Sequence, residues 1–123
     1  MSKKCVLVTG GRDYGNMERV FQELDTLGPD LIIEGGALGA DAHARKWAVE
    51  RGVSYGIFPA NWTKHDKAAG PLRNSTMVTV VKALGELGWK CTVLAFPGGR
   101  GTASCASIAT DAMLLVKRIT DEP

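Results

Sequence analysis

Glycine and arginine residues gather at a few places along the chain, in a pattern typical of phosphate binding. Ten of the 15 glycines fall in four short segments: Gly10, Gly11 and Gly15; Gly35, Gly36 and Gly39; Gly70; and Gly98, Gly99 and Gly101. Three of these segments also hold an arginine, namely Arg12, Arg73 and Arg100. Glycine lets backbone N–H groups approach a ligand closely, and a guanidinium binds phosphate through two hydrogen bonds. The residue types therefore predict a site for a phosphorylated ligand.

Two common nucleotide-binding motifs are absent. Gly10 and Gly15 have the spacing of a P-loop, but Asn16 and Met17 follow where that motif needs Lys and Ser or Thr. The G-x-G-x-x-G fingerprint of dinucleotide enzymes is missing from the same segment. The sequence thus excludes a P-loop NTPase and argues against a hydride-transfer enzyme.

Several polar and aromatic residues near the glycines have two interpretations each. Asp41 caps a helix or binds a ribose hydroxyl, and Thr102 and Ser104 cap a later helix or bind phosphate. Tyr14 and Trp62 stack on a base or pack against the protein. The sequence leaves these alternatives open.

The elements that carry these residues alternate between strands and helices. Apolar runs predict strands at residues 4–8, 31–33, 53–58, 91–96 and 114–119. Helical periodicity predicts helices over residues 17–27, from Ala40 to Gly52, over 77–84 and over 104–113. We therefore expect an α/β, Rossmann-like three-layer sandwich with a mostly parallel five-stranded sheet. Residues 1–123 should form a single domain, with a frayed tail at residues 120–123. Three of the glycine segments are loops that directly follow a strand, and the fourth, a loop around Gly70, follows the third strand after a longer polar stretch. These loops should therefore meet at the carboxyl edge of the sheet.

Composition excludes other classes of protein. The chain has 123 residues, of which 45% are hydrophobic and 23% charged, and its net charge is +2. This charge is too small to indicate nucleic acid as a partner, and Lys64, Lys67 and Arg73 form only a thin basic group. Three widely spaced cysteines and two histidines predict no metal site, and no other cofactor is expected. No apolar run approaches the roughly 20 residues of a membrane span, so we expect a cytoplasmic protein.

Four segments resemble the motifs of the SLOG superfamily, and most closely those of its small YspA-like branch in bacteria and phages. They are residues 8–14, 36–41, 69–74 and 96–102. The resemblance extends over nearly the whole chain. It implies a Rossmann-like fold and a pocket for a nucleotide or a nucleotide-derived molecule.

A related family, the LOG phosphoribohydrolases, releases the base from nucleoside monophosphates and carries the motif P-G-G-x-G-T-x-x-E. Residues 97–102 are similar to this motif, and Arg73 with Met77 resembles the family's upstream helix motif. The glutamate position of the motif holds Cys105, however. A thiol does not stabilise the positive charge that develops on the sugar as a carboxylate does. Cys105 is then a packed side chain or a nucleophile.

The sequence therefore predicts a binding protein for a nucleotide-derived ligand, acting as a sensor, a carrier or a sequestering protein. The alternative is a LOG-like nucleotide hydrolase with a degenerate motif, for which Asp41 and Arg73 are the candidate catalytic residues. Whether any reaction is catalysed stays open, as does assembly into a homodimer or higher homo-oligomer. The predicted ligand-binding residues are Gly10, Gly11, Arg12, Gly36, Gly39, Asp41, Arg73, Asn74, Pro97, Gly98, Gly99, Arg100, Gly101 and Thr102.

Overall fold

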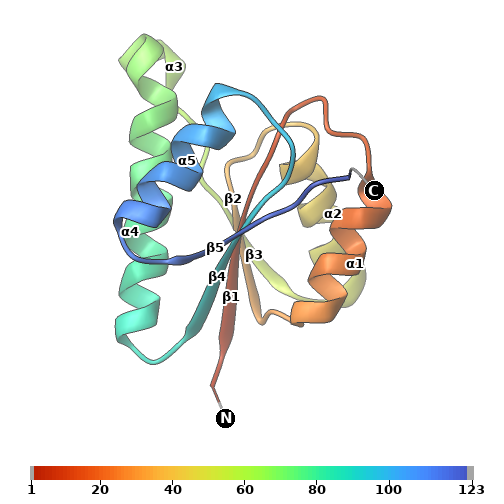
Figure 1. Ribbon diagram of the computed structural model, residues 1–123. Helices are drawn as coiled ribbons and strands as arrows, with labels where there is room; N and C mark the ends of the chain where they lie inside the picture. The colour runs from red at the N-terminus through yellow and green to blue at the C-terminus, as the bar shows by residue number, and fades with distance from the viewer. Residues whose placement is uncertain (1, 122–123) are drawn as a thin grey trace.

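A sheet of five parallel strands forms the centre of the computed structural model, which describes residues 2–121 (Figure 1). The strands are β1 (Lys4–Thr9), β2 (Leu31–Glu34), β3 (Ser54–Ile57), β4 (Lys90–Ala95) and β5 (Leu115–Arg118). They lie in the order β3-β2-β1-β4-β5, and all four pairings are parallel. The predicted α/β fold of Rossmann type is confirmed.

Helices cover both faces of this sheet, as Figure 1 shows. Helices α1 (Met17–Leu27) and α2 (Ala40–Arg51) pack on one face, and α4 (Ala69–Glu86) and α5 (Arg100–Asp111) pack on the other. A short helix, α3 (Trp62–His65), and a 3₁₀ turn, η1 (Asp66–Ala68), lead into α4. Among the described residues, no helix has the length and apolar character that crossing a membrane requires.

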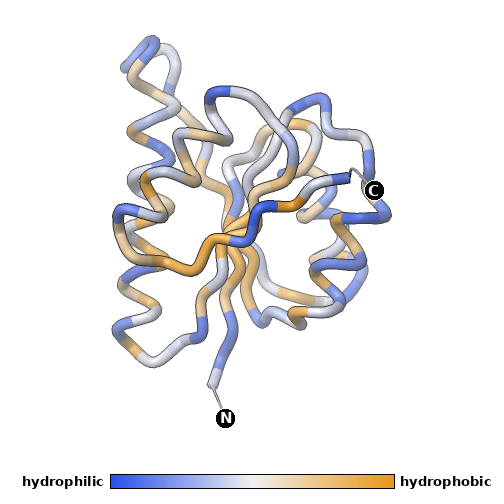
Figure 2. The backbone as a smooth tube through the Cα atoms, viewed as in Figure 1, coloured by the Kyte–Doolittle hydropathy of each residue, from blue (hydrophilic) through white to orange (hydrophobic). Residues whose placement is uncertain are grey.

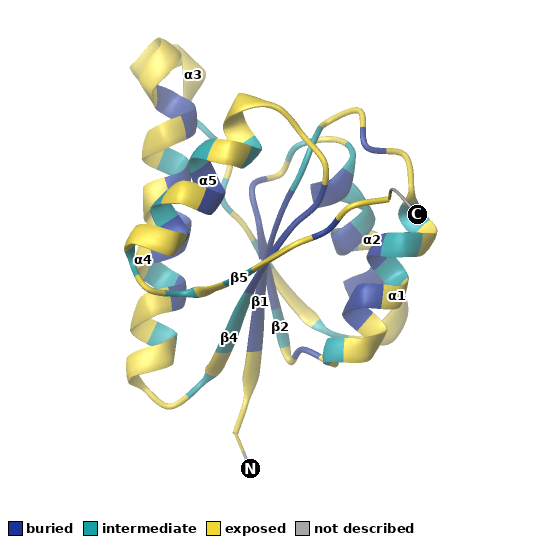
Figure 3. Ribbon diagram, in the orientation of Figure 1, coloured by how far each residue is buried: buried dark blue, intermediate teal, exposed yellow. Residues whose placement is uncertain are grey.

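Strand β1 explains why the sheet has two separate cores. Its successive side chains point to opposite faces, so Cys5 and Leu7 join the core under α4 and α5, while Val6 and Val8 join the core under α1 and α2. Figure 2 shows the resulting apolar centre, and Figure 3 shows that β1 and β2 are mostly buried. The edge strand β3 departs from the expected apolar pattern, because its residues are exposed or half-buried.

Two helices begin earlier than the periodicity predicts. The third predicted helix was placed at 77–84, but α4 begins at Ala69 and includes Gly70 and Pro71. The helix predicted for 104–113 is α5, which begins at Arg100. Both predictions were wrong at the start of the helix because the first turn contains Gly70 and Pro71 in α4 and Gly101 in α5, and these residue types disfavour a helix interior but are tolerated in a first turn.

The end of the chain is attached to the fold rather than frayed. The Arg19 guanidinium donates a hydrogen bond to the carbonyl oxygen of Thr120, and the Tyr14 hydroxyl donates to the Asp121 carboxylate. These two residues of the predicted tail therefore contact the start of α1. Residues 122–123 of that prediction lie outside the described residues.

Candidate functional site

A cavity of about 1250 Å³ opens at the carboxyl edge of the sheet. The strand order places this cavity at a topological switch point. From β1 the chain continues to β2 and β3 on one side of the sheet, and it then returns to β4 and β5 on the other side of β1. Loops that follow adjacent strands diverge at such a point and leave a crevice between them, which is where open α/β sheets bind their ligands. The cavity is large enough for a nucleotide, since ligand pockets usually measure about 300–1,000 Å³.

The structure brings the predicted residues together around this cavity, with one exception. Those that line it are Gly10, Gly11, Arg12, Gly36, Asp41, Arg73, Asn74, Pro97, Gly98, Gly99, Arg100, Gly101 and Thr102. Gly39 lies behind the lining instead. Its φ of 71° favours glycine, and a methyl group there would overlap the carbonyl oxygen of Gly11. Gly39 therefore lets α2 pack against the loop that follows β1.

Some of the lining glycines are required by protein packing. The N–H group of Gly11 donates to the carbonyl oxygen of Pro97, at 2.9 Å, which joins the loop after β1 to the loop after β4. A methyl on Gly98 would overlap the Thr102 hydroxyl and lie 2.6 Å from the Gly11 nitrogen. A methyl on Gly10 would crowd the first residue of α2. These glycines allow the loops to pack closely.

Gly99 and Gly101 differ, because a methyl group on either would have no atom within 4 Å beyond its own neighbours. Both residues line the cavity at the start of α5, where Gly99 is the N-cap and no side chain caps the helix. The N–H groups of the first turn, at residues 100–102, therefore point out of the helix without a side-chain acceptor. Arg12 and Arg100 line the same cavity and are exposed, and their guanidinium groups form no hydrogen bond or ion pair with another described residue. This arrangement of donors and cations suits an anion.

Asp41 is buried in the first turn of α2 and holds the loop before it. Its Oδ2 atom accepts hydrogen bonds from the N–H groups of Gly35 and Ala37, both at 3.2 Å. Burial raises the pKa of Asp41 to about 6, with a smaller contribution from the Glu34 carboxylate, although the loop N–H groups and the Arg73 guanidinium favour the charged form. The helix-capping interpretation was incomplete, since the carboxylate caps the loop in front of the helix, and the ribose interpretation stays a prediction for a side chain that lines the cavity.

Arg73 is fixed by acceptors of the protein. Its Nη1 atom donates to the carbonyl oxygens of Gly35, at 2.7 Å, and Phe58, at 3.4 Å, and its Nε atom donates to Asn74 Oδ1 at 2.9 Å. Asn74 in turn donates to the carbonyl oxygen of Gly101. Arg73 thus ties the ends of β2 and β3 to α4, and its Nη2 atom has no hydrogen-bond partner among residues 2–121.

The aromatic and sulfur candidates lie in different surroundings. The Tyr14 ring is 9% exposed and packs on Phe96, with 5.5 Å between ring centroids. Trp62 is 60% exposed and lines the cavity, and its ring covers Gly70. Cys105 is fully buried, and burial raises the pKa of its thiol to about 11. The packing interpretation therefore fits Tyr14 and Cys105, whereas Trp62 is available to a ligand.

Sequence reasoning missed one ion pair that supports this site, and it placed Lys67 in a thin basic group without assigning it to the ligand site. Glu34 is fully buried at the end of β2, where it accepts a hydrogen bond from the N–H of Gly36 and pairs with the Arg45 guanidinium at 2.9 Å. A glutamate directly after three apolar strand residues was the available signal for this pair. Lys67 lines the cavity, is exposed and has no ion-pair partner in the described part of the chain. Nothing in its local sequence distinguishes Lys67 from a surface lysine.

Two sequence comparisons with known proteins bear on the family of this chain. The model of a family described as the YspA, cpYpsA-related SLOG family matches residues 5–65. The Gene 61 protein of Mycobacterium phage D29 is 34% identical over 133 aligned positions, which cover 96% of this chain and 98% of the phage protein. The chain belongs to the YspA-related SLOG family. The resemblance predicted from the four motifs is therefore confirmed.

A solved structure supports the fold of this SLOG chain. The X-ray structure of DNA processing protein A (DprA) from Streptococcus pneumoniae has a TM-score of 0.52 and a sequence identity of 15%. The match covers 94% of the SLOG chain but only 58% of the DprA chain. At this identity, the likeness concerns the arrangement of helices and strands. The family match ends at residue 65, so it contains the loops after β1 and β2 but not the start of α5.

Proposed function

We propose that the cavity binds a nucleotide or a nucleotide-derived molecule, with a phosphate group against the start of α5. The observation that carries this proposal is the uncapped first turn of α5, which lines the same cavity as the unpaired guanidinium groups of Arg12 and Arg100 and contains no side chain at Gly99 or Gly101. Three N–H donors and two cations around one opening satisfy the charge and the acceptors of a phosphate group. Membership of the SLOG family, which suggests a nucleotide-related function, agrees with this chemistry.

Other lining residues suit the remainder of such a ligand. Trp62 offers an exposed aromatic face at the rim of the cavity, which is suitable for stacking on a base. The free Nη2 atom of Arg73 and the Asp41 carboxylate also line the cavity, near the ends of β2 and β3, and match ribose hydroxyl groups. We propose that the chain acts as a binding protein, because the position of the glutamate in the LOG motif holds the buried thiol of Cys105.

Equilibrium binding followed by chromatography tests this function. Equimolar protein is incubated with nucleoside monophosphates, ADP-ribose, NAD and cyclic nucleotides, and the bound and free fractions are analysed separately. An intact compound in the bound fraction, lost in Arg100→Ala but retained in Lys90→Ala, supports the proposal; Lys90 is an exposed cation at the opposite end of β4. Release of a free base would instead indicate a hydrolase. Binding of no compound in the panel would refute the proposed function.

A further inference from the structure

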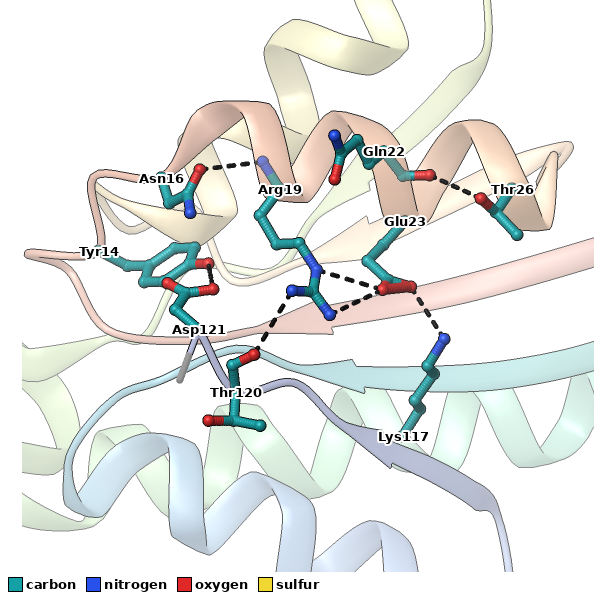
Figure 4. A network of polar contacts seen from close by, with 9 residues as sticks. All are labelled: Tyr14, Asn16, Arg19, Gln22, Glu23, Thr26, Lys117, Thr120 and Asp121. Carbon is teal, nitrogen blue, oxygen red and sulfur yellow. Dashed lines mark hydrogen bonds and ion pairs between the residues drawn. The ribbon is translucent and has the colours of Figure 1, made fainter. Parts of the chain in front are cut away.

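The last described residues of the chain bind to the loop and helix that follow β1, as Figure 4 shows. The Tyr14 hydroxyl donates to Asp121 Oδ1 at 3.0 Å, and Arg19 Nη1 donates to the carbonyl oxygen of Thr120 at 3.4 Å. Just before them, the N–H of Ile119 donates to the carbonyl oxygen of Ala95 at the end of β4. Residues 119–121, which we call the C-terminal strap, therefore connect the end of β4 to the start of α1.

Tyr14 connects this strap to the candidate site. Its N–H group donates to the carbonyl oxygen of Gly11, at 3.1 Å, and its own carbonyl oxygen lies 2.9 Å from His43 Nε2 on α2. Its ring packs on Phe96 in the core cluster under α1 and α2, to which Ile119 also belongs. Tyr14 is thus the large anchored side chain of the loop at residues 10–16, and the atom at its far end is held by the strap.

The same loop carries Arg12, which no side chain holds in place. The Arg12 guanidinium is exposed and forms no hydrogen bond or ion pair with another described residue, so its position depends on the backbone of the loop. That backbone is fixed by Gly11, which bonds to Pro97 on one side of Arg12, and by Tyr14 on the other. We therefore expect that loss of the Tyr14 hydroxyl bond loosens the backbone of the loop and with it the position of the Arg12 guanidinium, two residues earlier in the chain.

We propose that the C-terminal strap positions the ligand loop, with Tyr14 and Asp121 as positioning residues that hold Arg12 at the phosphate site. The inference rests on the proposed function, because it gives the strap control over the affinity of that site. Coupling of this kind is reciprocal. Binding of a phosphorylated ligand should therefore tighten the Tyr14–Asp121 bond in turn.

Two measurements on the full chain test the proposal. The first is amide hydrogen exchange of residues 11–15 in the ligand-free protein, and the second is the affinity for adenosine 5′-monophosphate and for inorganic phosphate by calorimetry. The variants are Tyr14→Phe, which keeps the ring on Phe96, and Asp121→Ala. The control is Lys82→Met, which removes the 2.7 Å hydrogen bond from Lys82 Nζ to the carbonyl oxygen of Ala112 on the other face of the sheet and touches neither the strap, the loop nor the cavity.

We expect faster exchange at residues 11–15 in both variants, and an affinity that is roughly three to ten times weaker. The double variant should be no weaker than either single variant, since both remove the same bond. Lys82→Met should match the parent protein in both measurements. Unchanged exchange in Tyr14→Phe would overturn the proposal, as would an equal effect of Lys82→Met on affinity. If the parent protein binds neither probe, the exchange measurement still decides whether the strap orders the loop, while the proposed function fails on its own.

Discussion

The substitution Gly101→Ala tests the proposed phosphate site by separating its effect on folding from its effect on binding. Gly101 lies in the first turn of α5, and a methyl group there would have no neighbouring atom within 4 Å. The substitution therefore causes no clash, and alanine favours the helix over glycine by about 0.5–1 kcal/mol in a helix interior. Because the first turn realises only part of that gain, we expect the free energy of unfolding to rise by about 0.5 kcal/mol and the melting temperature by about 2 °C.

The same methyl group should weaken binding, because it occupies space that a phosphate needs to reach the N–H groups of residues 100–102. Loss of one hydrogen bond to a charged ligand costs about 1.5 kcal/mol, which is roughly a tenfold loss of affinity. Thermal unfolding measures the first effect, and calorimetry with the compound retained in the chromatography experiment measures the second. A variant that is more stable and yet binds less tightly is the expected result.

The matched control is Gly85→Ala. Gly85 lies on the exposed side of α4, where a methyl would meet its nearest atom, Cys91 Sγ, at 3.9 Å. It is not part of the cavity lining. This variant should gain stability in the same way and bind as the parent protein does. If Gly101→Ala also keeps the parent affinity, the ligand does not approach the start of α5 and our reasoning about the site is wrong.

Three further variants test the structural roles assigned to site residues. Burial raises the pKa of Asp41 to about 6, so the folded protein binds the proton of this carboxyl group more tightly than the unfolded chain does. The parent protein therefore loses stability as the pH rises from about 4 to about 6. The free energy of unfolding of Asp41→Asn should therefore rise relative to that of the parent over this pH range, by up to about 3 kcal/mol. Urea unfolding at about pH 4 and pH 7 measures this, and the same difference between the two proteins at both pH values would contradict the prediction. Arg45→Met leaves Glu34 buried without its cation and should lower the free energy of unfolding by about 3 kcal/mol, a loss that Glu34→Gln in the same chain should partly recover. Gly39→Ala should cost about 2 kcal/mol or more, because the residue has a φ of 71° and faces the Gly11 carbonyl; an unchanged melting temperature would refute this role.

Local patterns were sufficient to predict most of the fold. The apolar run of β1 indicated a strand buried on both faces, and the structure uses Cys5 and Val6 in opposite cores. The position of the glycines after β1, β2 and β4 located the cavity, because all strands of a parallel sheet end at the same edge. The fourth glycine segment was misread as a loop. Gly70 lies within the first turn of α4, where the absence of a side chain makes room for the Trp62 ring.

The sequence by itself determined the order of strands and helices, the edge of the sheet that carries the site, and the residue types that face it. Those properties follow from periodicity and from backbone conformations, which are encoded over a few residues. Only the tertiary structure decided which polar groups are satisfied within the protein. Arg73 bonds to the carbonyl oxygen of Gly35, 38 residues away, and Tyr14 bonds to Asp121, 107 residues away. Partners so distant in the chain are brought together by strand order and helix packing, so a local pattern cannot distinguish an arginine held by carbonyl groups from one that is free to bind a phosphate.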